Sequence, residues 1–108
     1  MKSAQELKEI SRQHQLSNLA SNKMLQATFL LEKEMMDYIM SSEKYTGSFI
    51  LLYDSDLYKK ITELIDISQL KQYLSLLGYE IYNNEICVDG FDKWVTNGLE
   101  ISWNIKIY

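Results

Sequence analysis

Two carboxylates separated by one residue, Asp54 and Asp56, directly follow the apolar segment 49–53. Carboxylates at the end of a strand can hold a divalent cation or act as nucleophiles. The same side chains also commonly cap a helix, and a helix is expected over 56–65. Capping is favoured, because Tyr58 stands where a phosphatase-type motif needs Thr or Val, and because such a site needs a parallel sheet that this chain is too short to build well. A small metal-dependent hydrolase using Asp54 and Asp56 is kept as an alternative function.

The other residues that could do chemistry are isolated along the chain. Asp89 and Asp92 could form a cation-binding loop, but the regular acidic series and the terminal Glu of an EF-hand are missing, which favours a plain turn. His14 and Cys87 are the only histidine and the only cysteine, so neither a two-histidine site nor a Cys-based zinc site can form. We expect Cys87, between two apolar residues, to be an inert structural thiol. The four glycines are spread singly and form no phosphate-binding loop, so no cofactor is expected.

Acidic side chains gather in the C-terminal part of the chain. The formal net charge is −4, and Lys93 is the only basic residue between Glu80 and Glu100. Clustered Lys and Arg supply most nucleic-acid affinity, so direct nucleic-acid binding is disfavoured. Aromatic side chains supply much of the binding energy of protein interfaces, which makes Trp94 a partner-facing candidate unless it folds back onto the sheet. The candidate partner-binding residues are Glu80, Glu85, Asp89, Phe91, Asp92 and Trp94.

The N-terminal part of the chain is predicted to be helical. Ser3 and Glu6 fit a capping box, so a helix should begin near Ala4. A broad apolar stripe continues from there, but two leucines fall on its far side, which favours a break near 15–18 and a second helix over 17–40. The stripe consists of Leu7, Ile10, His14, Met24, Leu25, Thr28, Met35 and Ile39.

The two leucines off the stripe are Leu16 and Leu19. They could bury against a second copy of the chain, giving a homodimer, or against the sheet. Residues 1–23 could accordingly form a separate helical arm of the domain. The predicted second helix also carries four methionines, which could line an adaptable groove, although core filling is the favoured role. These are Met24, Met35, Met36 and Met40.

The middle of the chain is predicted to contain one strand and two short helices. The segment 49–53 is apolar on both faces, which is typical of a buried central strand. A helix is expected over 56–65. A further helix should be capped by Ser68 and ended by Gly78, which can adopt the left-handed conformation of a C-terminal cap.

The C-terminal part is predicted to be a meander of strands. Strands are expected at 79–82 and 86–88, with a turn at Asn83-Asn84 between them. Further turns are expected at Asp89-Gly90 and Asn97-Gly98. A final strand over 99–108 follows from strict alternation, with the apolar side formed by Leu99, Ile101, Trp103, Ile105 and Ile107.

The fold class that results is α+β, with N-terminal helices packed on a small, mainly antiparallel sheet that ends in the C-terminal strand. The 108 residues, 46% hydrophobic, are expected to form a single domain over 1–108. With one cysteine no internal disulfide forms, which fits a reducing cytoplasm. Neither a secretory signal nor a membrane span is expected, because charged residues interrupt the first 20 residues and no apolar run is long enough.

Two short motifs, Leu77-Gly-Tyr-Glu-Ile81 and Leu99-Glu-Ile-Ser-Trp103, resemble segments of small accessory proteins encoded by phages and prophages of low-GC Gram-positive bacteria. The resemblance covers residues 24–103 and includes a charged N-terminal helix and a Gly followed by a strand. This chain differs in having residues 104–108 after the Trp and a longer N-terminal segment. The resemblance implies a non-enzymatic accessory protein in the cytoplasm of the bacterial host cell that acts through a host or defence protein. It supplies no catalytic residues.

Three functions therefore stand as hypotheses. The first is a phage accessory protein that binds a protein partner through the acidic, aromatic-containing surface around Trp94. The second is the hydrolase of Asp54 and Asp56. The third is a small-ligand sequestering protein, which would need a pocket between helix and sheet.

Overall fold

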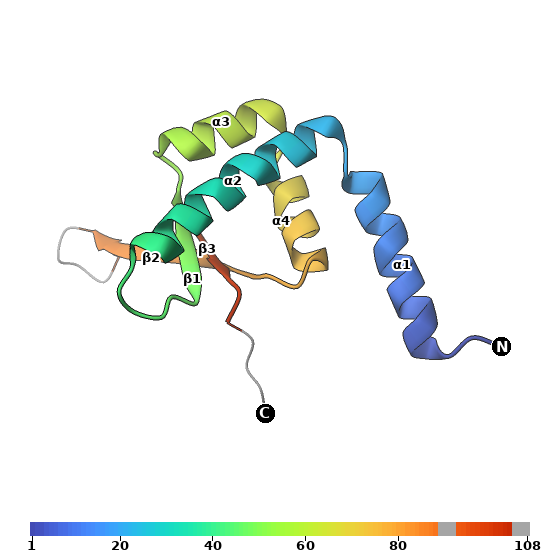
Figure 1. Cartoon of the computed structure of the whole chain (residues 1–108). Coiled ribbons are helices and arrows are strands. Elements are labelled where there is room, and N and C mark those ends of the chain that lie inside the picture. Colours follow the sequence, from blue (N-terminus) through green and yellow to red (C-terminus); the bar gives the residue numbers. More distant parts are fainter. Residues whose placement is uncertain (89–92, 105–108) are drawn as a thin grey trace.

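A computed structural model of the chain describes residues 1–88 and 93–104 (Figure 1). These residues form four helices and a three-stranded antiparallel sheet, which confirms the predicted α+β class. In chain order the elements are α1 (Ala4–Leu19), α2 (Asn22–Ser41), β1 (Ser48–Leu52), α3 (Asp56–Leu64), α4 (Ile67–Leu76), β2 (Glu80–Val88) and β3 (Lys93–Ser102).

Serine side chains start the first two helices. The Ser3 hydroxyl accepts from the backbone N–H of Glu6 at 3.2 Å, as the capping box predicts. The break between the helices is confirmed, but it lies later than the predicted 15–18. The hydroxyl of Ser21 accepts from the N–H of Met24 at 3.1 Å and caps α2. The chain changes direction there, so that α1 and α2 run at a steep angle to each other (Figure 1).

Helix α4 ends at the predicted glycine cap, but the predicted serine cap at its beginning was wrong. The helix starts after Asp66 instead of Ser68. At the other end Gly78 has φ 102°, the left-handed conformation in which glycine has no Cβ penalty. The N–H groups of Gly78 and Tyr79 donate to the carbonyls of Ser75 (3.1 Å) and Leu74 (3.0 Å), the pattern of a Schellman motif.

The sheet has the strand order β1-β3-β2, so β3 is the central strand. The prediction of a central strand at 49–53 was wrong: β1 lies at an edge, and Ile50 and Leu52 are exposed. Leu51 and Phe49 pair across the ladder with Leu99 and Ile101 of β3. An apolar run cannot by itself distinguish a strand covered on both faces from an edge strand whose second face is open.

Strands β2 and β3 are longer than the predicted meander, because two predicted turns do not form. Asn83-Asn84 lies within β2 and Asn97-Gly98 lies within β3. A Cβ on Gly98 would lie 2.5 Å from the carbonyl oxygen of Leu51, so glycine is needed there for close approach of β1 and not for a turn. The predicted turn at Asp89-Gly90 lies outside the described residues.

The last strand also differs from its predicted range. It ends at Ser102 instead of continuing to 108, and residues 105–108 lie outside the described part of the chain. Trp103 follows the strand and is held to the segment before β1. Its backbone N–H donates to Gly47 O at 2.9 Å, and its indole Nε1 donates to Thr46 O at 3.1 Å.

The hydrophobic core lies between the sheet and helices α2, α3 and α4. Leu99 and Ile101 of the central strand are almost fully buried, as the alternation predicts, and each such side chain contributes about 1.5–3 kcal/mol through burial. The buried side chains are Met24, Ala27, Leu31, Met35, Leu51, Ile61, Ile65, Leu70, Leu74, Leu99 and Ile101.

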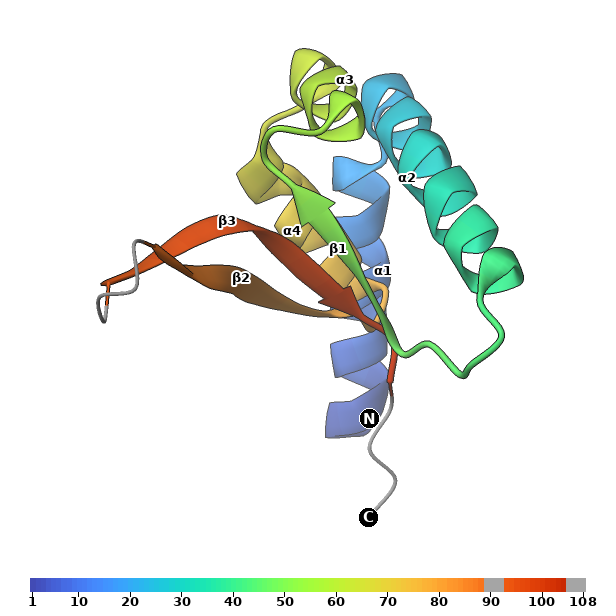
Figure 2. The same ribbon diagram turned by 90° about the vertical axis from the view of Figure 1, so that its left-hand side faces the viewer.

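Two parts of the chain project from this core. The radius of gyration is 16.2 Å, whereas a domain of this length typically has about 13 Å. Helix α1 carries no buried residue and stands beside the other helices, and the far end of the β2–β3 hairpin reaches beyond them (Figures 1 and 2). No described helix combines the length and the apolar character that crossing a membrane requires.

Candidate functional site

The most exposed apolar part of the sheet is the end of the β2–β3 hairpin, defined here as residues 85–88 of β2 and 93–96 of β3. In Figure 2 this hairpin end extends past the helices, so no helix covers it from either side. Trp94 is 62% exposed, and Ile86, Val95 and Cys87 are also exposed. Of the two alternatives for Trp94, partner-facing or folded back onto the sheet, its exposure fits the first.

An irregularity in the ladder decides which side chains share a face of the hairpin end. Asn84 pairs with Gly98 while Glu85 pairs with Thr96, so the extra residue, Asn97, belongs to β3. The alternation of β2 therefore continues without a break. It puts the pair Ile86–Val95 on the open face of the sheet, and the pair Cys87–Trp94 on the face that the helices cover elsewhere.

The root of the hairpin end is fixed by hydrogen bonds at this irregularity. The side-chain amide of Asn84 donates to Asn97 Oδ1 at 2.6 Å. The carbonyl of Asn97 accepts from the backbone N–H of Tyr53 at 2.9 Å, which ties β3 to the end of β1. The hairpin end therefore projects from an anchored base, and its apolar side chains are presented in a defined geometry.

The structure brings only some of the predicted partner-binding residues together. Glu85 is exposed and shares the face of Cys87 and Trp94. Glu80 lies at the opposite end of β2, about 17 Å away along the strand, on the other face. Asp89, Phe91 and Asp92 lie outside the described residues. The described acidic-aromatic surface thus reduces to Trp94 and Glu85.

Glu80 instead forms a local contact with Tyr82. The Tyr82 hydroxyl donates to the Glu80 carboxylate, and this hydrogen bond is the main cause of the raised pKa of Tyr82. The charges of Glu80 and of Glu100, which pairs with Tyr82 across the ladder, raise it further. The Tyr82 hydroxyl therefore stays protonated to a higher pH than that of an ordinary tyrosine.

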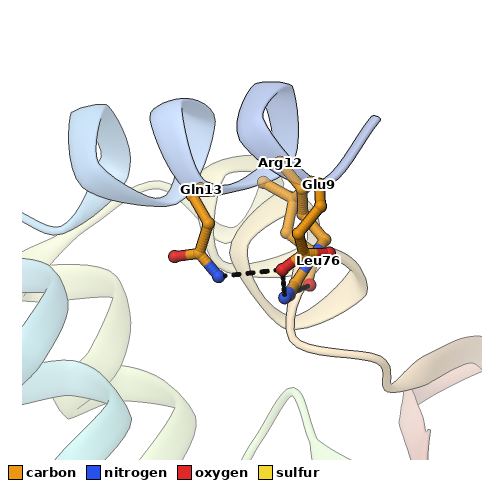
Figure 3. A network of polar contacts seen from close by, with 4 residues as sticks. All are labelled: Glu9, Arg12, Gln13 and Leu76. Atoms are coloured by element: carbon orange, nitrogen blue, oxygen red, sulfur yellow. Dashed lines mark hydrogen bonds and ion pairs between the residues drawn. The ribbon is translucent and has the colours of Figure 1, made fainter. Parts of the chain in front are cut away.

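Helix α1 is attached to the body by a polar network (Figure 3). The Arg12 guanidinium donates through Nη1 to the carbonyl of Leu76 at 2.8 Å, and through Nη2 and Nε to the Glu9 carboxylate at 2.5 and 3.1 Å. Gln13 donates to the same carboxylate at 3.1 Å. Hydrogen bonds from Arg12 and then Gln13 lower the pKa of Glu9 to about 2.

The predicted self-association residues on α1, Leu16 and Leu19, are partly buried. Helix α1 contacts α4. Whether the chain pairs through these leucines stays a prediction.

Asp54 and Asp56 flank the start of α3, as expected, but the prediction that their carboxylates cap the helix was wrong. Both are exposed, and the residue between them, Ser55, is the N-cap of α3, with its hydroxyl accepting from the N–H of Tyr58 at 3.2 Å. They follow a strand of an antiparallel sheet, not the parallel sheet that a phosphatase-type site needs. Within residues 1–88 and 93–104, no three His, Cys, Asp or Glu side chains gather closely enough to hold a metal ion.

The sequence interpretation missed a second apolar surface, on the outer side of α2. It assigned Leu25 to the core stripe and favoured core filling for the methionines. Met24 and Met35 do lie in the core, but Met36 and Met40 are exposed together with Leu25 and Phe29. The signal was present in the sequence as two apolar stripes on one helix, about 145° apart at 100° per residue.

The hollows along α2 are open grooves at the surface. One, of about 570 Å³, is lined by Asn22, Leu25, Gln26, Phe29, Leu30 and Leu64, between α2 and α3. No buried polar side chain occurs in the described residues to orient a small ligand. This geometry fits a macromolecular contact better than a sequestering pocket.

In comparisons with known proteins, no protein-family model, no curated protein and no solved structure matches the chain.

Proposed function

We propose that this chain is a non-enzymatic protein that binds a partner protein through the end of its β2–β3 hairpin. One observation carries the proposal: an anchored strand pair projects from the body with apolar side chains exposed on both faces, Trp94 on one and Ile86 with Val95 on the other. Exposed tryptophan is costly in water and is enriched among the residues that dominate protein interfaces.

The two-sided exposure favours a partner with a cleft over one with a flat surface. A flat partner would cover Trp94 and leave Ile86 and Val95 in water, whereas a cleft buries all three. A single exposed apolar residue is normal at a protein surface. Three neighbouring exposed apolar residues on a projecting element are typical of an interaction site.

The charge around Trp94 favours a partner with basic residues at the rim of that cleft. Glu85 shares the face of Trp94, the one basic residue of the described hairpin end, Lys93, alternates to the opposite face, and the whole chain carries a net charge of −4. Complementary charges steer association and lose strength as salt screens them. A basic nucleic-acid-binding protein is the partner class that these charges fit best.

The cellular setting of the proposal follows from the resemblance described above. We take the partner to be a host or defence protein in the bacterial cytoplasm, with the chain acting as a phage or prophage accessory protein. The geometry of the hairpin end supports binding of a protein; the proposal that this protein belongs to the host rests on the resemblance alone.

The proposal is tested by affinity capture from a lysate of a low-GC Gram-positive bacterium, with three immobilised baits compared by mass spectrometry. These are the unaltered chain, Trp94→Ser, and Tyr45→Ser, a matched control because Tyr45 is 81% exposed in the connection before β1. A true partner should be retained by the unaltered chain and by Tyr45→Ser, and lost with Trp94→Ser. Equal capture by all three baits, or no protein captured by any of them, would contradict the proposal.

A purified partner then permits two sharper measurements. In a Trp103→Phe variant the remaining tryptophan is Trp94, so its fluorescence emission should shift to shorter wavelength as the partner buries it. Raising salt from about 50 to 200 mM should weaken binding several-fold, and Glu85→Gln should reduce that dependence. An affinity that is unchanged by salt would exclude the charged rim.

A further inference from the structure

The outer edge of β2 is the longer of the two free edges of the described sheet. In the order β1-β3-β2, strand β2 pairs with β3 on one side only, over the nine residues Glu80–Val88. Most strands have about five or six residues, so this edge is long. The backbone N–H and C=O groups along a free edge are a template on which a further strand can pair.

The hydrogen bonds of the central strand determine which backbone groups of β2 point to this edge. The N–H of Trp103 donates to the carbonyl of Gly47, so the odd-numbered residues 99–103 bond towards β1 and the even-numbered ones between them bond towards β2. No described residue outside the sheet bonds to the backbone groups of β2 that point away from β3. Among residues 80–86 these groups belong to Ile81, Asn83 and Glu85.

The free edge of β2 is regular, because the irregularity of the ladder lies in β3. The extra residue, Asn97, belongs to the central strand, so β2 keeps an unbroken alternation along its whole length. Edge strands are commonly protected from further pairing by a bulge, a proline, a lysine or a short length. Strand β2 has none of these four protections.

The other edge of the sheet is protected. Strand β1 has only the five residues Ser48–Leu52, and by the same alternation the carbonyl of Leu52 points to its free edge. That carbonyl already accepts from the N–H of Ser55 at 3.1 Å and from its hydroxyl at 2.6 Å. A further strand therefore fits beside β2 and not beside β1.

The charges on β2 determine which kind of strand this edge accepts. Glu80 and Glu85 are exposed, and β2 contains no basic residue. Glu100 of β3 adds a third carboxylate, opposite Tyr82. Opposite charges across a strand pair are stabilising and like charges are destabilising. A basic strand is therefore complementary to this edge, whereas β2 of a second copy would add two more carboxylates and no base.

We infer that the partner protein pairs an extended, basic segment with the free edge of β2 as a fourth strand, antiparallel to β2. The inference rests on the proposed function, since it states how that partner engages the hairpin end. The edge runs between the face of Trp94 and the face of Ile86, so one cleft can enclose both faces and supply the strand. Main-chain hydrogen bonds give affinity in this mode, and antiparallel pairs are the more stable kind.

The alternation of β2 specifies the side chains that the added strand should carry. Tyr82 and Ile86 are each about half-exposed on the open face, in positions where an added strand would place its own side chains closest. Apolar residues are expected opposite these two, and basic residues opposite Glu85 and Glu80. Read from its N-terminus, the recognised segment is then apolar, basic, any two residues, apolar, any residue, basic.

The first test uses the synthetic nine-residue peptide Val-Thr-Val-Arg-Thr-Thr-Val-Thr-Lys, which in antiparallel register places Arg opposite Glu85 and Lys opposite Glu80. Two versions each carry three N-methyl groups. In the first version they replace N–H groups that point away from β2, and in the second N–H groups that point towards it. Fluorescence anisotropy should give the first a Kd between about 10 and 500 μM, and the second should bind at least about tenfold more weakly.

The second test changes the charge of the edge. Glu85→Lys should weaken binding of the first peptide about five- to tenfold, and should strengthen binding of a peptide in which Glu replaces Arg. Glu63→Lys is the matched control, because it makes the same change of charge at an exposed position of α3. It should change Kd less than about twofold, since a distant exposed charge is screened.

Hydrogen exchange followed by NMR locates the added strand on the full chain. With the first peptide free at about ten times its Kd, the amides of Ile81, Asn83 and Glu85 should exchange about tenfold more slowly. The amides of Tyr82 and Asn84 are the internal control, because they already bond to β3 and should change less.

Four results would overturn the inference. They are no binding of the first peptide at about 1 mM, equal binding of the two N-methylated versions, equal losses with Glu63→Lys and Glu85→Lys, and slower exchange of the outward amides as the concentration of the chain alone rises. The last result would identify a second copy as the occupant of the edge.

The proposed function fails or holds separately from this inference. Trp94 lies on β3, which β2 separates from the free edge, so Trp94→Ser should leave peptide binding unchanged while it abolishes capture of the partner. Capture that depends on Trp94 without peptide binding would refute strand addition alone. Peptide binding without capture that depends on Trp94 would refute the proposed function.

Discussion

The guanidinium of Arg12 donates to the carbonyl oxygen of Leu76 across 2.8 Å, and this bond joins α1 to the last turn of α4. The Leu76 carbonyl is one of those that have no partner within their own helix, and a cation there also complements the helix dipole. Because α1 has no buried residue, this polar contact is the best-defined link between α1 and the rest of the protein.

Arg12→Ala should therefore loosen α1 without unfolding the domain. Alanine is the best helix former, so faster exchange of the α1 amides in the variant would report lost attachment and not lost helix propensity. The global free energy of unfolding should change little, since the pair is solvent-exposed and screened by water. Hydrogen exchange followed by NMR measures both. Lys8→Ala is the control, and equal α1 exchange in both variants would show that α1 is held by other contacts.

The same network should make the Glu9 carboxylate unusually acidic. Its pKa is lowered from 4.5 to about 2, so the stabilising effect is fully present above pH 4.5 and disappears as the pH falls through about 2. Carboxyl ¹³C NMR titration should show Glu9 still ionised at pH 3. In Arg12→Ala the midpoint should return close to the ordinary value, and an unshifted Glu9 in the unaltered chain would refute the network.

Gly98 should tolerate alanine less well than Gly78. A Cβ at Gly98 would lie 2.5 Å from Leu51 O and 3.0 Å from the Cα of Leu52, both backbone atoms that cannot move aside cheaply. We expect Gly98→Ala to cost about 1–3 kcal/mol or more. Gly78→Ala meets no atom within 4 Å and should cost about 1 kcal/mol, from its φ of +102°. Urea unfolding of both variants measures the two losses of stability. A larger loss for Gly78→Ala than for Gly98→Ala would contradict the prediction.

The two tryptophans should differ sharply in their contribution to stability. Trp103→Phe removes the indole donor to Thr46 O and should cost about 1–2 kcal/mol. Trp94→Phe changes an exposed side chain and should stay within about 0.5 kcal/mol. Thermal unfolding monitored by circular dichroism separates the two. A large loss at Trp94 would mean that the hairpin end contributes to the fold and would weaken its assignment as a binding surface.

Divalent cations should not stabilise the protein through Asp54 and Asp56. The two carboxylates are exposed at the start of α3, and Ser55 between them is the residue that caps the helix. A ligand at a hundred times its Kd would add about 2.7 kcal/mol, which a thermal-shift assay detects easily. A shift with Mg²⁺, Mn²⁺ or Ca²⁺ that disappears in Asp54→Asn would restore the hydrolase hypothesis.

Several features of the fold could be predicted because they depend on neighbours in sequence. The Ser3 cap, the glycine that ends α4 and the burial of Leu99 and Ile101 all follow from local spacing, and each agrees with the structure. The same reasoning failed at Asn83-Asn84 and Asn97-Gly98. These pairs are typical of turns, but pairing of β2 with β3, and of β3 with β1, holds them extended.

The candidate sites show the same division. The sequence offered Trp94 as a candidate partner-facing residue and left open its folding back onto the sheet. The extension of its strand beyond the helices is visible only in the structure. The exposed apolar surface of α2, formed by Leu25, Phe29, Met36 and Met40, was present in the sequence as a second apolar periodicity. Which of the two stripes is buried depended on where α3, α4 and the sheet pack.

By itself, then, the sequence determined the α+β class, the helix caps, the single-cysteine chemistry and the acidic character of the C-terminal part, because composition and short-range spacing are sufficient for these. Only the tertiary structure decided that β3 is the central strand, that β1 is an edge, and that Trp94, Phe29 and Met40 face solvent. Strand order and exposure arise from contacts between residues far apart in the chain, and local patterns carry no record of which distant element will cover a given face.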